Sequence, residues 1–295
     1  MSSCNTCPSA SGCTQDSASC MVENNVHNQV KNVIAVMSGK GGVGKSTVTA
    51  LLAKKLTKLG YKVGVLDADV TGPSIPRLFG IKNGQALSTE YGATPVMSSE
   101  NIATMSLNYL VDDEESPVLW RGPIISGTVK QFWTDVYWGE LDYLLIDMPP
   151  GTGDVSLTVM QSIPLTGAVV VSTPHDMVSM IVAKSINMAK KMNVPILGLV
   201  QNMSYVLCPD CTTKIELFEK NDIESYLKRL DIELLGELPM SSKVANMSSH
   251  VMYETEIHAC MDSVSDKVIE FVNSKKAGNN FPAFLIKSFI FSKAV

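Results

Sequence analysis

The sequence contains no run of about 18 consecutive apolar residues, the length that a transmembrane helix requires, so we expect no integral membrane span. Its N-terminus lacks a basic segment followed by an apolar one, and no secretory signal is therefore visible. Positive charge is not in excess, because the chain has 24 Lys and Arg residues and 29 Asp and Glu residues, which give a net charge of −5. A broad nucleic-acid-binding face is not expected from this balance. These absences predict a cytoplasmic globular protein whose partners include no nucleic acid.

Disulfide bonds are not expected either, although the chain of 295 residues has seven cysteines. Without a secretory signal, thiols are usually reduced and available to metals. Residues 1–30 are rich in Ser, Asn and Cys and poor in apolar residues, so they cannot bury enough surface to fold without a metal. We predict a separate arm here that is flexible in the absence of metal. The arm has enough thiols for a second cluster or a zinc ion: Cys4, Cys7, Cys13 and Cys20.

Apolar, β-branched segments alternate with helical patterns from Val33 onward. This order is typical of an α/β fold with a mainly parallel, twisted sheet and helices on both faces. A meander at residues 94–110 is expected to interrupt the alternation. Strands are predicted at residues 33–38, 62–67, 143–147, 168–173, 196–201 and 232–236. Helices are predicted at residues 45–59, 122–137, 154–163, 176–192, 221–230 and 254–275.

We place one domain at residues 31–276 and an apolar tail at residues 277–295. The tail ends in FPAFLIKSFIFSKAV, which is aromatic for a chain end and too short to cross a bilayer. We favour packing of this tail on its own fold. Binding to a membrane surface or to a partner is the alternative.

The segment Ser38–Thr47, read as SGKGGVGKST, fits the phosphate-loop pattern G-x-x-x-x-G-K-[ST] and stands between an apolar strand and a helical pattern. Its glycines let the backbone turn its N–H groups inward, so that they form an anion-binding nest at a helix N-terminus. Lys45 supplies a positive charge for the β- and γ-phosphates, and the Ser46 hydroxyl can ligate Mg²⁺. The motif therefore predicts binding of a nucleoside triphosphate. The predicted contacts are Gly39, Lys40, Gly41, Gly42, Val43, Gly44, Lys45, Ser46 and Thr47.

Two further apolar strands end in aspartate. One runs into Asp67 and Asp69 and is followed by VTGPSIP; the other runs into Asp147 and is followed by MPPGTGD. A phosphate-loop site needs a carboxylate opposite the loop to hold Mg²⁺, and Asp147 fits this place best. Hydrolysis needs a group that orients water, for which we choose Asp69. The alternative is that these acids cap helices.

A second set of thiols, Cys208 and Cys211, forms the sequence CPDC after the predicted strand at 196–201. A C-x-x-C pair supplies two soft ligands, which make half of a tetrahedral zinc site or part of an iron–sulfur site. Two chains that meet at this loop would complete the site. A thioredoxin-like redox pair is a competing interpretation, although these cysteines do not begin a helix in a short βαβ unit.

The doubled-lysine loop GKGGVGKST resembles the loop of the MinD/ParA/nitrogenase-iron-protein class of dimeric ATPases. More narrowly, four motifs together resemble the Mrp family of iron–sulfur cluster carrier ATPases, which includes the eukaryotic cytosolic cluster-assembly scaffolds. The motifs are GKGGVGKST, LDADVTGPSIP, IDMPPGTGD and QNMSYVLCPDC. The resemblance implies that Lys40 reaches across a dimer to the partner's nucleotide, and that Lys45, Ser46 and Thr47 contact phosphates and Mg²⁺.

The same resemblance implies roles for the remaining motif residues. Asp69 matches the switch aspartate that activates water, and Asp147 matches the second acidic strand end. Asn202 matches an asparagine that contacts the base. Cys208 and Cys211 match the pair that holds a 4Fe–4S cluster between two subunits.

The function implied is that of an ATP-dependent carrier, which assembles a labile 4Fe–4S cluster at a dimer interface and passes it to apo iron–sulfur proteins. Its cofactors would be ATP, Mg²⁺ and the cluster, and its hydrolysis would be slow and switch-like. The dimer could be a homodimer or a heterodimer with a related ATPase. The alternatives are a MinD/ParA-like positioning ATPase with structural zinc at the thiols, and a reductase like the nitrogenase iron protein.

Overall fold

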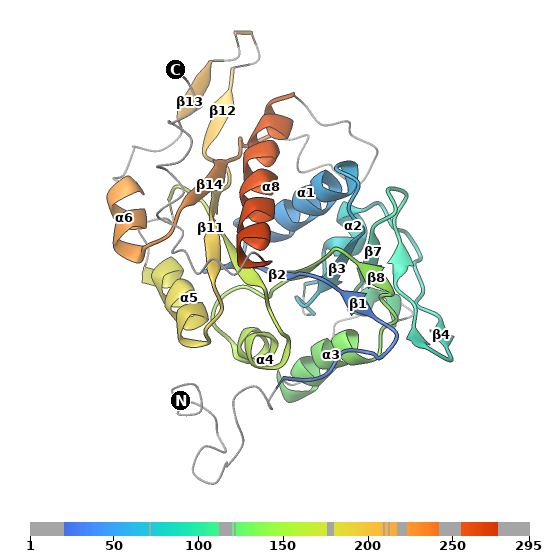
Figure 1. Ribbon diagram of the computed structural model, residues 1–295. Helices are drawn as coiled ribbons and strands as arrows, with labels where there is room; N and C mark the ends of the chain where they lie inside the picture. The colour runs from blue at the N-terminus through green and yellow to red at the C-terminus, as the bar shows by residue number, and fades with distance from the viewer. Residues whose placement is uncertain are drawn as a thin grey trace.

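Eight strands form one twisted sheet at the centre of the molecule (Figure 1). The computed structural model describes residues 21–70, 72–111, 120, 122–175, 180–208, 210–211, 213–216, 223–241 and 255–276. Within them, the strand order is β14-β11-β10-β2-β9-β3-β7-β6, and all neighbours are parallel except β6 and β7. The strands are β2 Val33–Ser38, β3 Val63–Asp67, β6 Val96–Met97, β7 Ala103–Met105, β9 Tyr143–Asp147, β10 Gly167–Ser172, β11 Ile196–Gln201 and β14 Leu234–Glu237. The predicted α/β fold with a mainly parallel sheet is confirmed.

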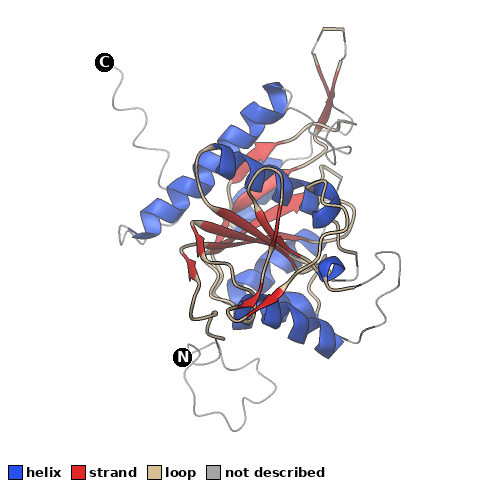
Figure 2. Cartoon of the chain, turned by 90° about the vertical axis from the view of Figure 1, so that its right-hand side faces the viewer, coloured by secondary structure: helices blue, strands red, loops and turns tan. Residues whose placement is uncertain are grey.

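Helices cover both faces of this sheet, as Figure 2 shows. One face carries α1 Lys45–Lys58, α2 Ile75–Leu78 and α8 Thr255–Lys276. The other carries α3 Gly122–Thr134, α4 Asp154–Ser162, α5 Met180–Lys191 and α6 Ile223–Leu230. Because both faces are covered, all six residues of β2 are buried, which explains its continuous apolar sequence.

The first long helix, α1, shows how the sequence positions the phosphate loop. Val48, Leu51, Leu52 and Leu56 recur every three or four residues, and all are buried on the face that packs against the sheet. The helix ends before Gly60, whose φ of 91° suits a glycine after a helix end. Burial of this apolar stripe holds the loop at the carboxyl end of β2.

Three small two-stranded sheets complete the described fold. β1 and β8 pair in parallel, whereas β4 with β5 and β12 with β13 form antiparallel hairpins. A single 3₁₀ turn, η3 Leu107–Tyr109, follows β7. The small strands are β1 Gln29–Val30, β4 Ser88–Thr89, β5 Gly92–Ala93, β8 Glu140–Leu141, β12 Tyr205–Leu207 and β13 Lys214–Glu216.

The predicted strands and helices are present, and wherever the flanking residues are described their ends either coincide with the prediction or differ by at most three residues. The expected interruption at residues 94–110 is partly wrong. β6 and β7 do form an antiparallel pair, but β7 also pairs in parallel with β3 and so extends the main sheet. The hairpin β12–β13 was not predicted, since strands of three residues leave no periodic pattern.

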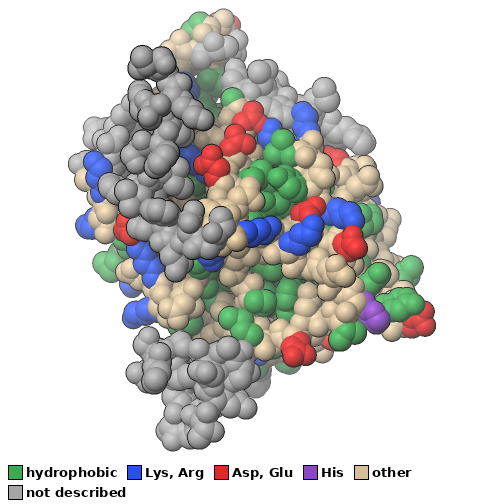
Figure 3. Space-filling model, in the orientation of Figure 1, with side chains coloured by type: hydrophobic (Ala, Val, Ile, Leu, Met, Phe, Trp, Pro, Cys, Tyr) green, Lys and Arg blue, Asp and Glu red, His purple; other side chains and the backbone are tan. Residues whose placement is uncertain are grey.

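Residues 21–30 run along the surface of the described fold. The Val22 N–H donates to Ser162 O at 2.9 Å, and Trp133 Nε1 donates to Val22 O at 3.0 Å. The cysteines predicted to form a second site, at positions 4, 7, 13 and 20, lie outside the described residues, as does the tail at 277–295. None of the described helices combines the length and apolar character that crossing a membrane requires. On the face shown in Figure 3, basic and acidic side chains are interspersed.

Candidate functional site

The loop between β2 and α1 turns at two glycines in the left-handed region of backbone space. Gly42 has a φ of 81° and Gly44 a φ of 79°, values that a residue with a Cβ rarely adopts. α1 begins directly after Gly44, at Lys45. The positive end of the helix dipole therefore meets the N–H groups of the loop, which is the arrangement that binds phosphate.

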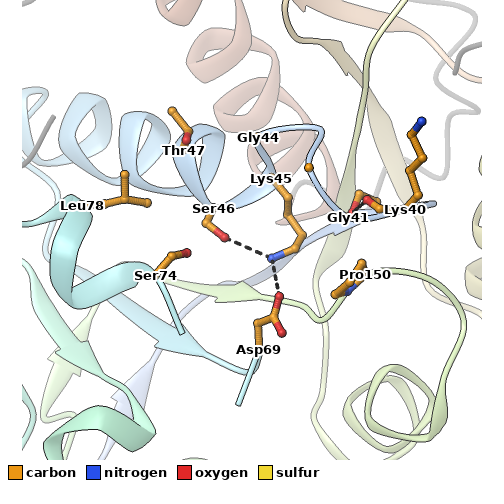
Figure 4. A pocket seen from close by; sticks show the side chains of 12 residues that line it. Lys40, Gly41, Gly44, Lys45, Ser46, Thr47, Asp69, Ser74, Leu78 and Pro150 are labelled. Atoms are coloured by element: carbon orange, nitrogen blue, oxygen red, sulfur yellow. Dashed lines mark hydrogen bonds and ion pairs between the residues drawn. The ribbon is translucent and has the colours of Figure 1, made fainter. Parts of the chain in front are cut away.

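A pocket of about 240 Å³ opens beside this loop (Figure 4). This volume is below the roughly 300–1,000 Å³ of most small-molecule sites, so the pocket suits the polyphosphate part of a nucleotide better than a whole one. Asp69 and Pro150 line the side opposite Lys45, while the Lys40 side chain points away from both Lys45 and Asp69. The lining residues are Ser38, Lys40, Gly41, Gly42, Gly44, Lys45, Ser46, Thr47, Asp69, Ser74, Leu78 and Pro150.

Lys45 and Asp147 form a buried ion pair at this pocket. Lys45 Nζ lies 2.8 Å from Asp147 Oδ1 and 3.8 Å from Asp69 Oδ2. Ser46 Oγ donates to Asp147 Oδ2 at 2.5 Å, and Thr49 Oγ1 donates to Asp147 Oδ1 at 2.9 Å. The structure thus brings together three residues that the sequence placed there only by motif, and it adds Thr49. A hydroxyl and a carboxylate held this close are oxygen donors of the kind that Mg²⁺ prefers.

Asp67 and Asp147 are register partners on β3 and β9, and both side chains are fully buried. Burial, together with the negative charge of Asp147, raises the pKa of Asp67 to about 8. The Asp67 carboxyl group accepts hydrogen bonds from the N–H of Asp69 at 3.2 Å, the N–H of Ile75 at 3.3 Å and Ser106 Oγ at 3.2 Å. Asp67 therefore ties the segment that carries Asp69 to the sheet.

Replacing Asp67 by Asn is expected to flatten the pH dependence of stability. With a pKa near 8 in the folded protein and an ordinary value of 3.8, the native state binds more protons than the unfolded state between these limits. The free energy of unfolding of the wild type should therefore fall as pH rises through this window, by up to about 1.4 kcal/mol per pH unit. Urea denaturation of the nucleotide-free protein at several pH values measures this slope. Equal slopes for wild type and variant would show that Asp67 is ionised in the native state.

Sequence reasoning missed Thr49 and Ser106. Thr49 stands four residues after Lys45, one turn along the same helix. This spacing places the two side chains on one face and could have indicated that Thr49 lies at the site. Ser106 lies just after β7, a strand too short to be predicted, so nothing in the sequence placed it near Asp67.

Asn202 follows β11 and contacts the phosphate loop. Its Nδ2 donates to Val43 O at 2.9 Å, and its own N–H donates to Ser172 O at 2.8 Å. Asn202 is buried and is not among the residues that line the pocket. Its contact with a base stays a prediction.

The CPDC thiols lie at the turn of the hairpin β12–β13, which projects from the body of the molecule (Figures 1 and 2). The Cys208 N–H donates to Thr213 O at 3.0 Å, and the Cys211 sulfur lies 3.1 Å from Thr213 Oγ1. Hydrogen bonds from the Thr213 side chain and backbone, and from Cys208, lower the pKa of the Cys211 thiol. Cys208 is half-buried and Cys211 exposed, so both can meet a metal at the surface.

One chain supplies only part of a metal site at this hairpin. Among the described residues, no group of three or more His, Cys, Asp or Glu side chains is close enough to hold a metal ion. Tetrahedral sulfur sites need four ligands, so the two thiols amount to half of one. The described residues of the hairpin turn also form no helix N-terminus of the kind that activates a thioredoxin-like pair, which argues against that alternative.

Comparison with protein families identifies the family to which the chain belongs. The family described as ParA, NUBPL iron-transfer P-loop NTPase, matches residues 29–273. The chain belongs to this family. The sequence-based resemblance to iron–sulfur carrier ATPases of the MinD/ParA-like class is thereby confirmed, and membership in a P-loop NTPase family supports ATP hydrolysis.

Curated relatives of this iron-transfer NTPase extend over most of the chain. It is 43% identical over 283 residues to an iron-sulfur cluster carrier protein of Methanocaldococcus jannaschii, covering 92% of this chain and 97% of that protein. It is 40% identical to the cytosolic Fe-S cluster assembly factor CFD1 of Yarrowia lipolytica, covering 84% of this chain and 90% of that protein.

Solved structures agree with the fold. A nucleotide-binding protein of Archaeoglobus fulgidus in complex with ADP has a TM-score of 0.66 and 45% identity, over 74% of this chain and 86% of that one. The cell division ATPase MinD of Pyrococcus furiosus has a TM-score of 0.58 at 18% identity, over 81% of this chain and 98% of that one. The second likeness shows the fold alone.

Proposed function

We propose that this P-loop NTPase is an ATP-dependent carrier that binds a 4Fe–4S cluster between two subunits and passes it to apo iron–sulfur proteins. The observation that carries the proposal is the presence, on one chain, of a phosphate pocket and an exposed pair of thiols on a projecting hairpin. The relatives named as cluster carriers and as a cytosolic assembly factor support it. The cytosolic relative also supports a cytoplasmic location.

The geometry of the loop between β2 and α1 explains how the protein would bind the phosphates of a nucleotide. The N–H groups around Gly42 and Gly44 and the N-terminus of α1 attract the phosphates. Lys45 pairs with Asp147 at 2.8 Å at the edge of the same pocket, so its ammonium group can turn to a phosphate oxygen without leaving the site. If Lys45 moved from Asp147 to a phosphate oxygen, phosphate binding would leave the Asp147 carboxylate at the end of β9 without its cation.

Ser46 and Asp147 are the residues that would hold Mg²⁺, because their oxygens lie 2.5 Å apart. The ion, when bound, neutralises phosphate charge. Asp69 lines the pocket with its Oδ2 at 3.8 Å from Lys45 Nζ, where its carboxylate can orient a water molecule toward the phosphates. Asp67 keeps Asp69 in place through the hydrogen bond from the Asp69 N–H. Hydrolysis would be slow, because the nucleotide acts as a switch and the useful result of each cycle is a conformational change of the protein.

A dimer would complete both the nucleotide site and the thiol site. Lys40 is exposed, and at the rim of the pocket its side chain points away from Lys45 and Asp69, which fits a contact with the nucleotide of a partner subunit. Cys208 and Cys211 supply two of the four ligands of a 4Fe–4S cluster, and a second copy or a related ATPase supplies the others.

The positioning ATPase with structural zinc is not favoured. The curated relatives at 40–48% identity are named as cluster carriers or cytosolic assembly factors, whereas the MinD structures are only 18–21% identical.

Transfer of a cluster to an acceptor tests the proposal. The protein is loaded anaerobically with iron and sulfide, mixed with an apo iron–sulfur protein, and followed by the acceptor's spectrum with and without ATP and Mg²⁺. We expect ATP to change the transfer rate by at least about 5-fold, the lower end of typical coupling between sites. A protein that retains zinc and passes no cluster would contradict the proposal.

A further inference from the structure

The carbonyl group of Val43 and the N–H of Gly44 belong to one peptide unit of the phosphate loop. Asn202 Nδ2 donates to that carbonyl at 2.9 Å, although Asn202 is separated from Val43 by 159 positions along the chain. A peptide unit is planar and trans, so its carbonyl and N–H point in opposite directions. By holding the carbonyl, Asn202 fixes the direction in which the Gly44 N–H points.

The contact between Asn202 and the loop is close. A Cβ added at Gly44 would lie 2.2 Å from Asn202 Nδ2, so position 44 must be glycine for this reason as well as for its φ of 79°. Asn202 is 4% exposed, and its own N–H is held by Ser172 O. The side-chain amide of Asn202 is therefore buried directly against the loop at Val43 and Gly44.

On its other side, Asn202 leads directly into the thiol hairpin. Met203, the next residue, has a φ of 57°, a left-handed value that costs free energy for a residue with a side chain. The Ser204 N–H donates to Leu238 O at 2.9 Å, and β12 begins at Tyr205, three residues before Cys208. Within the described part of the chain, the buried Gln201 Oε1 has no hydrogen-bond partner. The left-handed backbone of Met203 thus stores local strain at the corner between β11 and β12.

We propose that Asn202 is a positioning residue that couples phosphate binding at the loop to the arrangement of the hairpin that carries Cys208 and Cys211. A phosphate that takes the Gly44 N–H reorients the peptide unit, and the Val43 carbonyl shifts the Asn202 amide with it. The strained corner at Met203 passes this shift to β12. The inference rests on the proposed function, because it explains how ATP would act on the thiols.

The test measures the alkylation rates of Cys208 and Cys211 by iodoacetamide in metal-free protein, followed by peptide mass spectrometry so that other thiols do not contribute. Saturating ATP with Mg²⁺ should change the wild-type rates by about 5-fold or more. In Asn202→Ala, at a nucleotide concentration that saturates the variant, the ratio should fall below about 2-fold, since the interaction that carries the coupling is gone. Asn202→Leu, which keeps a similar side-chain volume and has no group that can donate to Val43 O, should behave in the same way.

Asn32→Ala is the matched control. Asn32 is also 4% exposed and also donates its amide to a backbone carbonyl, that of Asp142 at 2.8 Å, but it precedes β2 at the opposite end of the sheet. It should lose stability like the Asn202 variants and keep the full nucleotide response. Inorganic tripolyphosphate should reproduce the ATP effect in the wild type, because the coupling begins at the phosphates.

Two results would overturn the inference. One is a full nucleotide response in both Asn202 variants; the other is a response to ATP but none to tripolyphosphate, which would place the coupling at the base. Because no cluster is present in this assay, either result leaves the cluster-transfer experiment, and with it the proposed function, to be judged separately.

Discussion

Replacing Lys45 by Ala is expected to weaken ATP binding by about 100-fold, equivalent to roughly 3 kcal/mol for a lost charge-assisted contact with phosphate. The reason lies in the pocket itself, where Lys45 Nζ is the cation nearest to both Asp69 and Asp147 among the described ion pairs. Isothermal titration calorimetry with ATP and Mg²⁺ measures the change. Lys58→Ala, which removes an exposed lysine from the last turn of the same helix, is the control and should bind ATP as the wild type does.

The same substitution should also lower the stability of the nucleotide-free protein. It leaves Asp147, fully buried, with hydroxyl partners but without its cation. Removing one partner of a buried ion pair typically costs about 3–5 kcal/mol. Urea denaturation should therefore show a clear loss for Lys45→Ala and little for Lys58→Ala. Unchanged ATP affinity in Lys45→Ala would mean that the nucleotide binds elsewhere.

The second large effect is expected at the thiols. Changing Cys208 and Cys211 together to Ala should remove the iron and sulfide that the protein takes up at the interface and should weaken the dimer. Among the described residues, no group of three or more His, Cys, Asp or Glu side chains could hold the metal in their place. The measurement is iron, sulfide and zinc content after anaerobic reconstitution, with the absorption spectrum. ATP binding should persist, since neither cysteine lines the phosphate pocket.

Cys260→Ala is the matched control for the thiol variant. Cys260 lies on α8, half-buried, with its sulfur 3.7 Å from the Tyr205 hydroxyl, and it should leave the iron content unchanged. If the double variant at the hairpin keeps its full iron content, the thiols of the first 20 residues hold the cluster and the interface assignment is wrong.

The parts of the site that the sequence predicts are those encoded over a few consecutive residues. The glycines, Lys45 and Ser46 form a local motif, and its backbone conformation follows from the residue types, as the positive φ at Gly42 and Gly44 shows. Strand ends were equally readable, because parallel strands buried on both faces give continuous apolar runs. Asp147 could therefore be placed opposite the loop, where the structure finds it paired with Lys45.

The contacts that the sequence did not predict depend on distant segments meeting. The hydrogen bond between Asn202 and Val43 O joins the residue after β11 to the phosphate loop after β2, and only the sheet order brings these two segments together. The burial of Asp67 beside Asp147 follows from the pairing of β3 with β9, which the alternation of elements does not specify. The β12–β13 hairpin is too short for a pattern, so the projection of the thiols became visible only in the fold.

Native mass spectrometry of the anaerobically reconstituted wild type tests the central claim, that two chains share one cluster at Cys208 and Cys211. We expect a dimer whose added mass equals one 4Fe–4S cluster per two chains, with little cluster on free monomers. Monomers that each carry a complete cluster, or dimers that carry only zinc, would contradict it.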